Sequence, residues 1–295
     1  MKKKVQLCFV AVLTILFAVH SNNSYSQTTL STGDVVFTGY NTDGLVSSVS
    51  YADTFVFMPL VSLSANTTII FTDGSWQDAN GYFSLSSTTA DWVCIWQTSS
   101  SVAAFTQIKV WSGANCGTSC SAGTSVGSII GGRGLPLVIS GDQLFACQGI
   151  SSIDTSSAYT YTPSTIITGI HFNYISGTTT TSNWDNGAGV TVTTSELPNV
   201  LTDGTNAAWL YASGPTESDN GQYNCTVTSG TASTVRSAAC NVSNWNFDDV
   251  NPFAPAACTP TTTDYYYNGS GTITSLSSWG TNTDGTGTAP GSFNT

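Results

Sequence analysis

Short runs in which apolar side chains recur at every second position are the feature that most constrains the fold. The clearest sets are Val35 and Phe37, Phe55 and Phe57, Ile69 and Phe71, Trp92, Cys94 and Trp96, and Ile108 and Val110. Because successive side chains of a strand point to opposite faces of a sheet, each set would lie on one face. Clusters of Gly, Asn, Asp and Ser separate the runs and predict turns. The pattern predicts an all-β, β-sandwich-like fold with many short antiparallel strands.

Further short apolar runs extend the same pattern towards the C-terminus. They cover residues 137–139, 144–147, 166–174, 190–193 and 207–211. Only residues 232–240 have a helical character, and a Thr or Ser before them would serve as the N-cap. We therefore expect one short helix among the strands.

Residues 1–26 have the organisation of a secretory signal peptide. Three lysines at positions 2–4 precede a mostly apolar run over residues 5–19, and Ser24 to Ser26 supply small residues near a cleavage point. The run is shorter than the roughly 18 residues that a membrane-spanning helix needs. We expect an exported chain that starts near Gln27, is secreted or held at the cell surface, and is not inserted in a membrane.

The charge of the exported chain excludes two classes of partner. Without residues 1–26, only Lys109, Arg133 and Arg236 oppose seventeen acidic residues. Nucleic-acid binding needs clustered cations to neutralise phosphates, and binding to an anionic membrane surface needs them too. The 40% hydrophobic content is ample for a packed core and argues against disorder.

Seven cysteines remain after residue 26: Cys94, Cys116, Cys120, Cys147, Cys225, Cys240 and Cys258. Export makes disulfides the default expectation. We predict a Cys116–Cys120 staple and a Cys225–Cys240 pair, although sequence alone does not fix connectivity. A metal site at Cys116 and Cys120 is the alternative, but it lacks a second close pair of ligands. The odd count leaves one thiol buried or paired outside the chain.

The amino-acid composition of the sequence changes after Cys258. Residues 27–258 contain no long linker, so they are expected to form one β-sandwich-like domain. Residues 259–295 are rich in Thr and Gly. We interpret them as a linker and the start of a truncated second module.

The stretch FTDGSWQDANGYF, residues 71–83, is a candidate calcium loop. Asp73, Asp78 and Asn80 offer the oxygen ligands that calcium prefers. It departs from the helix-loop-helix calcium pattern, since it lacks alternating aspartates and a terminal Glu. The alternative is that its Asp-Gly and Asn-Gly pairs only form turns. A structural calcium ion remains the one cofactor that the sequence suggests.

Tryptophans beside turn residues are candidates for stacking on sugar rings. An aromatic ring covers the apolar face of a sugar while nearby amides and carboxylates bind its hydroxyls. Trp76 and Trp184 fit this description, whereas Trp92 and Trp96 alternate with other residues and are expected in the core. Glycans or cell-surface components are thus the expected partners.

A formal match to a hydrolase motif carries little weight. Residues 123–127, GTSVG, place Ser125 in a nucleophile-elbow pattern, and Asp154 and His171 follow in the order of a catalytic triad. The motif works only at a sharp strand-to-helix turn, and the flanks here are loops. His171 alternates with apolar residues, which favours a histidine satisfied by packing and one hydrogen bond. No spacing singles out a glycosidase pair of carboxylates, so we expect no catalytic residues.

Five segments in a fixed order carry a resemblance to a known group of proteins. They are GDVVFTGYNTDG (33–44), DTFVFMPLVSLSANTTIIFTDGSW (53–76), GDQLFACQG (141–149), LPNVLTDGTNAAWL (197–210) and VSNWNFDDVNPF (242–253). The chain resembles an N-terminal module of large secreted or surface proteins of Bacteroidetes-type bacteria, which often use the type IX route. The resemblance implies a β-rich extracellular module without established activity. We expect a non-catalytic adhesion or spacer module; a secreted hydrolase, another carbohydrate-active enzyme or a glycan-binding module are the alternatives.

Overall fold

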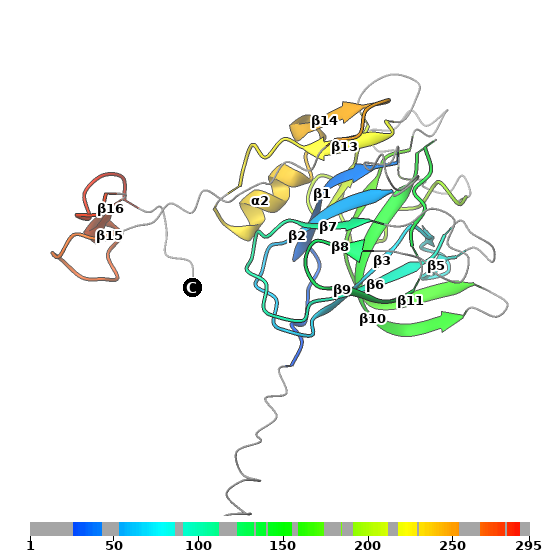
Figure 1. Ribbon diagram of the computed structural model, residues 1–295, viewed down its shortest axis with the longest axis horizontal. Coiled ribbons are helices and arrows are strands. Elements are labelled where there is room, and N and C mark those ends of the chain that lie inside the picture. The colour runs from blue at the N-terminus through cyan, green and yellow to red at the C-terminus, as the bar shows by residue number, and fades with distance from the viewer. Residues whose placement is uncertain are drawn as a thin grey trace, which may run out of the picture.

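The computed structural model describes most of the chain between residues 26 and 289. It covers residues 26–42, 53–85, 91–111, 123–132, 134–139, 141–154, 159–173, 184, 191–211, 218–228, 230–253, 266–280 and 282–289. In these residues two large, mainly antiparallel sheets pack together beside one α-helix (Figure 1). The predicted all-β, sandwich-like fold with one short helix is confirmed.

The first sheet joins strands from both ends of the domain. Its order is β14-β13-β1-β2-β7-β8. The strands are β1 (Val35–Asn41), β2 (Thr54–Pro59), β7 (Ile108–Trp111), β8 (Gly123–Thr124), β13 (Asn220–Tyr223) and β14 (Trp245–Asp248). β1 lies between β2, its neighbour in sequence, and β13, where Gly39 faces Gln222.

The second sheet carries the candidate site. Its order is β4-β5-β11-β10-β3-β6-β9, and β12 pairs with β11 in parallel. The strands are β3 (Thr68–Thr72), β4 (Ser75–Gln77), β5 (Tyr82–Ser84), β6 (Val93–Gln97), β9 (Ser128–Gly132), β10 (Gln143–Asp154), β11 (Thr160–His171) and β12 (Ala207–Trp209).

Aromatic side chains fill the space between the two sheets. Phe57 of the first sheet lies 4.8 Å from Phe71 and 5.2 Å from Trp96 of the second, measured between ring centroids. Both partners are fully buried, as their alternating positions predicted. A second apolar cluster, around Phe83 and Phe145, covers the opposite face of the second sheet. The second sheet is therefore buried on both faces over these strands.

The helix α2 (Ala232–Ala239) closes one end of the first core. Thr231 is its N-cap, and the hydroxyl oxygen accepts a hydrogen bond from the Thr234 amide at 3.1 Å. Val235 and Ala239 are buried in the core, and Cys240 caps the C-terminal end. The helix and its type of N-cap agree with the prediction from sequence, and the helix ends at Ala239, one residue before the predicted end.

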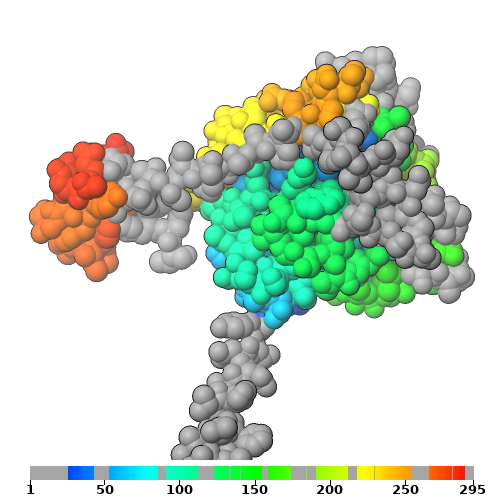
Figure 2. Space-filling view, viewed as in Figure 1, coloured from blue at the N-terminus to red at the C-terminus, as the bar shows by residue number. Residues whose placement is uncertain are grey.

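A small hairpin follows in the Thr- and Gly-rich segment. β15 (Tyr266–Tyr267) and β16 (Trp279–Gly280) form a two-stranded sheet that pairs with neither large sheet. Figure 2 shows it, in orange and red, standing apart from the main body. Two short 3-10 turns complete the described elements, η1 (Val242–Asn244) and η2 (Leu276–Ser278). Nowhere in the described residues is a helix long and apolar enough to cross a membrane.

One of the two predicted disulfides is not formed. Cys94, Cys147 and Cys240 are buried free thiols, so the predicted Cys225–Cys240 pair is wrong. Cys240 ends α2 inside the core, where its thiol is buried and unpaired. Cys225 is disulfide-bonded, and its partner lies outside the described residues. Cys116 and Cys120 also lie outside them, so that pair stays a prediction.

Candidate functional site

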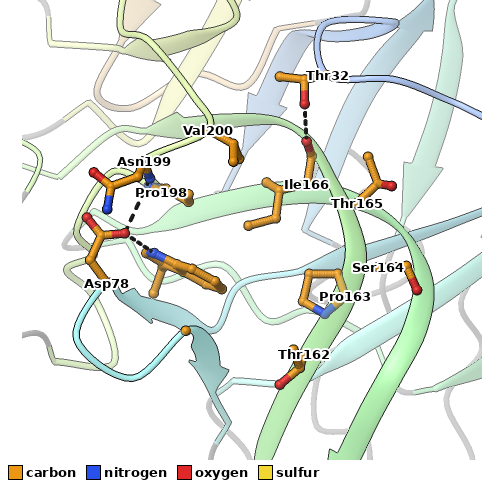
Figure 3. A pocket seen from close by; sticks show the side chains of 12 residues that line it. Thr32, Asp78, Thr162, Pro163, Ser164, Thr165, Ile166, Pro198, Asn199 and Val200 are labelled. Carbon is orange, nitrogen blue, oxygen red and sulfur yellow. Dashed lines mark hydrogen bonds between the residues drawn. The ribbon is translucent and has the colours of Figure 1, made fainter.

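An open groove of about 450 Å³ runs beside strand β11. One wall is the β11 segment Thr162, Pro163, Ser164, Thr165 and Ile166. Across from it lie Trp76 and Asp78 at the end of β4 and the loop residues Pro198, Asn199 and Val200. Figure 3 shows Asp78 and Asn199 close together, with Pro163 and Ser164 on the strand facing them.

The indole of Trp76 is held in place from several sides. Its Nε1 donates a hydrogen bond of 2.7 Å to Asp78 Oδ1. Its ring packs edge-on against Phe83, with 4.9 Å between the ring centroids. The Trp76 backbone amide donates to Ser195 Oγ at 2.8 Å. The ring is half-buried, so part of it remains available in the groove. A fixed aromatic surface of this kind loses little conformational entropy when a ligand binds.

Residues 195–199 fasten the far side of the groove to β4. Glu196 Oε2 accepts the Asp78 amide at 2.6 Å, and the Glu196 amide donates to the Trp76 carbonyl at 3.1 Å. The Asn199 amide donates to Asp78 Oδ1 at 3.3 Å. Sequence reasoning missed this loop, because nothing local in residues 195–199 indicates contact with a strand about 120 positions earlier. Their only signal was that Glu196 is one of two glutamates in the chain.

The groove combines apolar and hydrogen-bonding groups, and none of its described lining residues carries a positive charge. Trp76, Pro163, Ile166 and Val200 offer apolar contact. Hydroxyls of β11, the Asn199 amide and the Asp78 carboxylate offer donors and acceptors. Such a mixture matches a sugar ring, which has apolar faces and a rim of hydroxyls.

The three predicted calcium ligands are not brought together. Asp73 is fully buried, and its Oδ1 accepts the Trp92 amide at 2.6 Å. Asp78 and Asn80 are exposed, Asp78 is bound to Trp76, and the Asn80 side chain donates to Gln77. No group of three or more His, Cys, Asp or Glu in the described residues is arranged to hold a metal ion. Residues 78–81 form the turn between β4 and β5, with Gly81 at a φ of 70°.

Trp184 is a core residue, so its assignment to a ligand rim was wrong. Its exposed fraction is 1%, and its ring lies 5.8 Å from Phe145 and 5.2 Å from His171. The indole Nε1 donates to Asp203 Oδ1 at 3.1 Å. The turn residues next to Trp184 do not indicate this burial, because the residues that bury it are distant in the chain.

No family model matches this chain. Curated proteins and solved structures likewise give no significant match. The resemblance to secreted Bacteroidetes-type modules therefore remains a prediction.

The formal catalytic triad does not assemble. His171 is fully buried, and neither Nδ1 nor Nε2 has a hydrogen-bond partner. Ser125 Oγ instead accepts the Lys109 backbone amide at 3.0 Å. A catalytic triad needs its histidine hydrogen-bonded to both the serine and the carboxylate, so these residues do not form one.

Proposed function

We propose that this chain is a non-catalytic extracellular module that binds a carbohydrate in the Trp76 groove and thereby serves adhesion. The observation that carries the proposal is the fixed, half-buried indole of Trp76 beside the Asp78 carboxylate. The expected export of the chain would place this groove outside the cell, where glycans are abundant. The module would act as part of a larger secreted or surface protein.

The arrangement of the two carboxylates favours binding over hydrolysis. Asp78 Oδ1 accepts hydrogen bonds from Trp76 and Asn199, and Glu196 Oε2 accepts the Asp78 amide. These bonds use the carboxylates to hold the groove in shape. A glycosidase instead needs two carboxyl groups that flank the scissile bond, one of them protonated. A secreted hydrolase is therefore the less favoured function.

Replacing Trp76 tests the proposal directly. We expect Trp76→Ala to abolish retention of the chain by its polysaccharide in affinity gel electrophoresis, because the stacking surface is lost. Asp78→Ala should weaken retention less, since the indole keeps its contact with Phe83. A panel of neutral and acidic polysaccharides serves as the probe.

Trp279→Ala is the matched control, because it removes an indole from the separate hairpin. It should retain polysaccharide as the wild type does. Thermal melts of each variant show whether the domain is still folded. Normal retention by a folded Trp76→Ala variant would refute the proposed site.

A further inference from the structure

Three buried aspartates lie at the same end of three neighbouring strands, and we call them the aspartate cluster. Asp73 follows β3, Asp91 precedes β6 and Asp142 precedes β10. The strands lie side by side, because Thr72 of β3 faces Phe145 on one side and Val93 on the other. The exposed fractions are 0% for Asp73, 5% for Asp91 and 1% for Asp142. Carboxyl groups are seldom buried this completely without a partner.

Hydrogen bonds tie the cluster into one unit. Trp92, the neighbour of Asp91, donates its amide to Asp73 Oδ1 at 2.6 Å. Gln143 donates its backbone amide to Asp142 Oδ1 at 2.8 Å, and its side-chain amide donates to the carbonyl of Asp73. The three strand ends therefore share one polar network.

Asp73 and Asp142 differ in how their oxygens are satisfied. Both oxygens of Asp142 accept backbone amides, from Gln143 at 2.8 Å and Val138 at 3.0 Å. Asp73 Oδ2 is buried and has no partner. A charged oxygen in that position would lose its hydration without compensation, whereas a protonated one would carry no charge.

The surrounding charges act in the same direction. Burial, and then the charges of Asp142 and Asp91, raise the pKa of Asp73 well above its usual range. The other titratable groups that face the cluster in the described residues are Asp53, beside Asp142, and the Cys94 thiol, beside Asp73. Neither is a cation, and Arg133 lies outside the described residues.

We propose that Asp73 is a neutral carboxylic acid at neutral pH, with its proton on Oδ2, and that losing this proton loosens the end of the sandwich from which β4 and the groove begin. Asp73 lies two positions before the start of β4, so a shift of the backbone at Asp73 would also move Trp76. Burial also raises the pKa of Asp91 to about 8. For carboxyls with raised pKa values, stability is fully present below about pH 4 and is lost as the pH rises through the folded-state values.

The variants Asp73→Asn and Asp142→Asn separate a protonated from an ionised Asp73. An asparagine imitates a neutral acid at Asp73, so this variant should match or exceed the wild-type melting temperature at about pH 8 and lose less stability between about pH 6 and 9. Asp142→Asn removes an acceptor from a paired backbone amide and should lower the melting temperature at every pH. If Asp73→Asn is as destabilising as Asp142→Asn at neutral pH, the proposal is overturned.

Two further measurements, one spectroscopic and one on metal dependence, test the proposal in ways other than the pH dependence of stability. Infrared spectroscopy at neutral pH should show the C=O stretch of buried protonated carboxyls, and Asp73→Asn should lose the part of this band that Asp73 contributes while the part from Asp91 remains. Thermal melts in EDTA and in calcium chloride at about pH 8 should coincide. A band that Asp73→Asn leaves unchanged would overturn the proposal. A melting temperature raised by calcium only while Asp73 is present would also overturn it and would indicate a metal ion in place of the proton.

Discussion

His171 shows how complete burial changes the chemistry of a single residue. Its ring is fully buried beside Trp184, and burial lowers the pKa of the imidazole to about 3. The sequence predicted a histidine satisfied by packing and one hydrogen bond. The packing is present, but the hydrogen bond is not, since both ring nitrogens lack a partner. His171 therefore stays neutral at any pH at which the domain is expected to function.

We expect His171 to make the domain sensitive to acid. A lowered folded-state pKa gives a contribution to stability that is fully present above about pH 6.5 and is lost as the pH falls towards 3. The contribution changes by up to about 1.4 kcal/mol per pH unit in this window. His171→Leu should remove this slope from urea unfolding measured between about pH 4 and 7. Equal slopes in the two chains would contradict the assignment.

The two tryptophans chosen from the sequence show where prediction at the residue scale fails. Trp76 and Trp184 both stand beside turn residues. One lines a groove, and the other fills the core because Phe145 and Asp203 surround it. Local sequence signals exposure only through polar neighbours, and it carries no information about partners supplied by distant strands.

At the scale of the element, α2 was predictable because its signals are local. The N-cap hydroxyl, the helix-favouring run and the buried stripe all lie within residues 231–240. By contrast, β10 and β11 are longer than predicted, with twelve residues each. Their outer halves pair with one another, and positions such as Ile150, Ile153 and Ser164 are exposed, so no alternation of buried residues marks them. Pairing across a hairpin, which sequence patterns do not report, sets their length.

The cap of α2 gives a prediction at this scale. Thr231→Ala removes the oxygen that accepts the Thr234 amide, so we expect a loss of about 1 kcal/mol in the free energy of unfolding. Thr231→Ser keeps an equivalent hydroxyl and should change stability by a few tenths of a kcal/mol at most. Urea titrations of both variants measure the difference. If the two variants lose the same stability, the cap hydrogen bond contributes nothing.

At the scale of the whole molecule, the environment of each cysteine depends on contacts between distant parts of the chain. Cys94, Cys147 and Cys240 stay free inside the core, and burial raises the pKa of each thiol. Export alone predicted disulfides, but the position of each cysteine on a strand face or helix end decides which of them can pair. The groove likewise needs β4, β11 and residues 195–199, which only the complete fold brings together.

The disulfide of Cys225 leads to a prediction about the boundary of the domain. If Cys116 pairs with Cys120, Cys258 is the one cysteine after residue 26 that is left to pair with Cys225. Mass spectrometry of a non-reduced digest should find Cys225 linked to Cys258, and reduction should cost about 2–4 kcal/mol of stability. Alkylation of the native chain should leave the three buried thiols unmodified. A peptide linking Cys225 to Cys116 or Cys120 would refute this connectivity.

The place of β1 between β2 and β13 also determines when folding can be completed. β1 can meet β2 early, but its other edge has no partner until residues 220–223 have been synthesised. Closing so long a loop costs chain entropy before the pairing compensates for it, so sheets built from distant strands form slowly. A chain that leaves the cell with its N-terminus first would then remain incompletely folded during passage and finish its first sheet only after almost the whole domain has emerged.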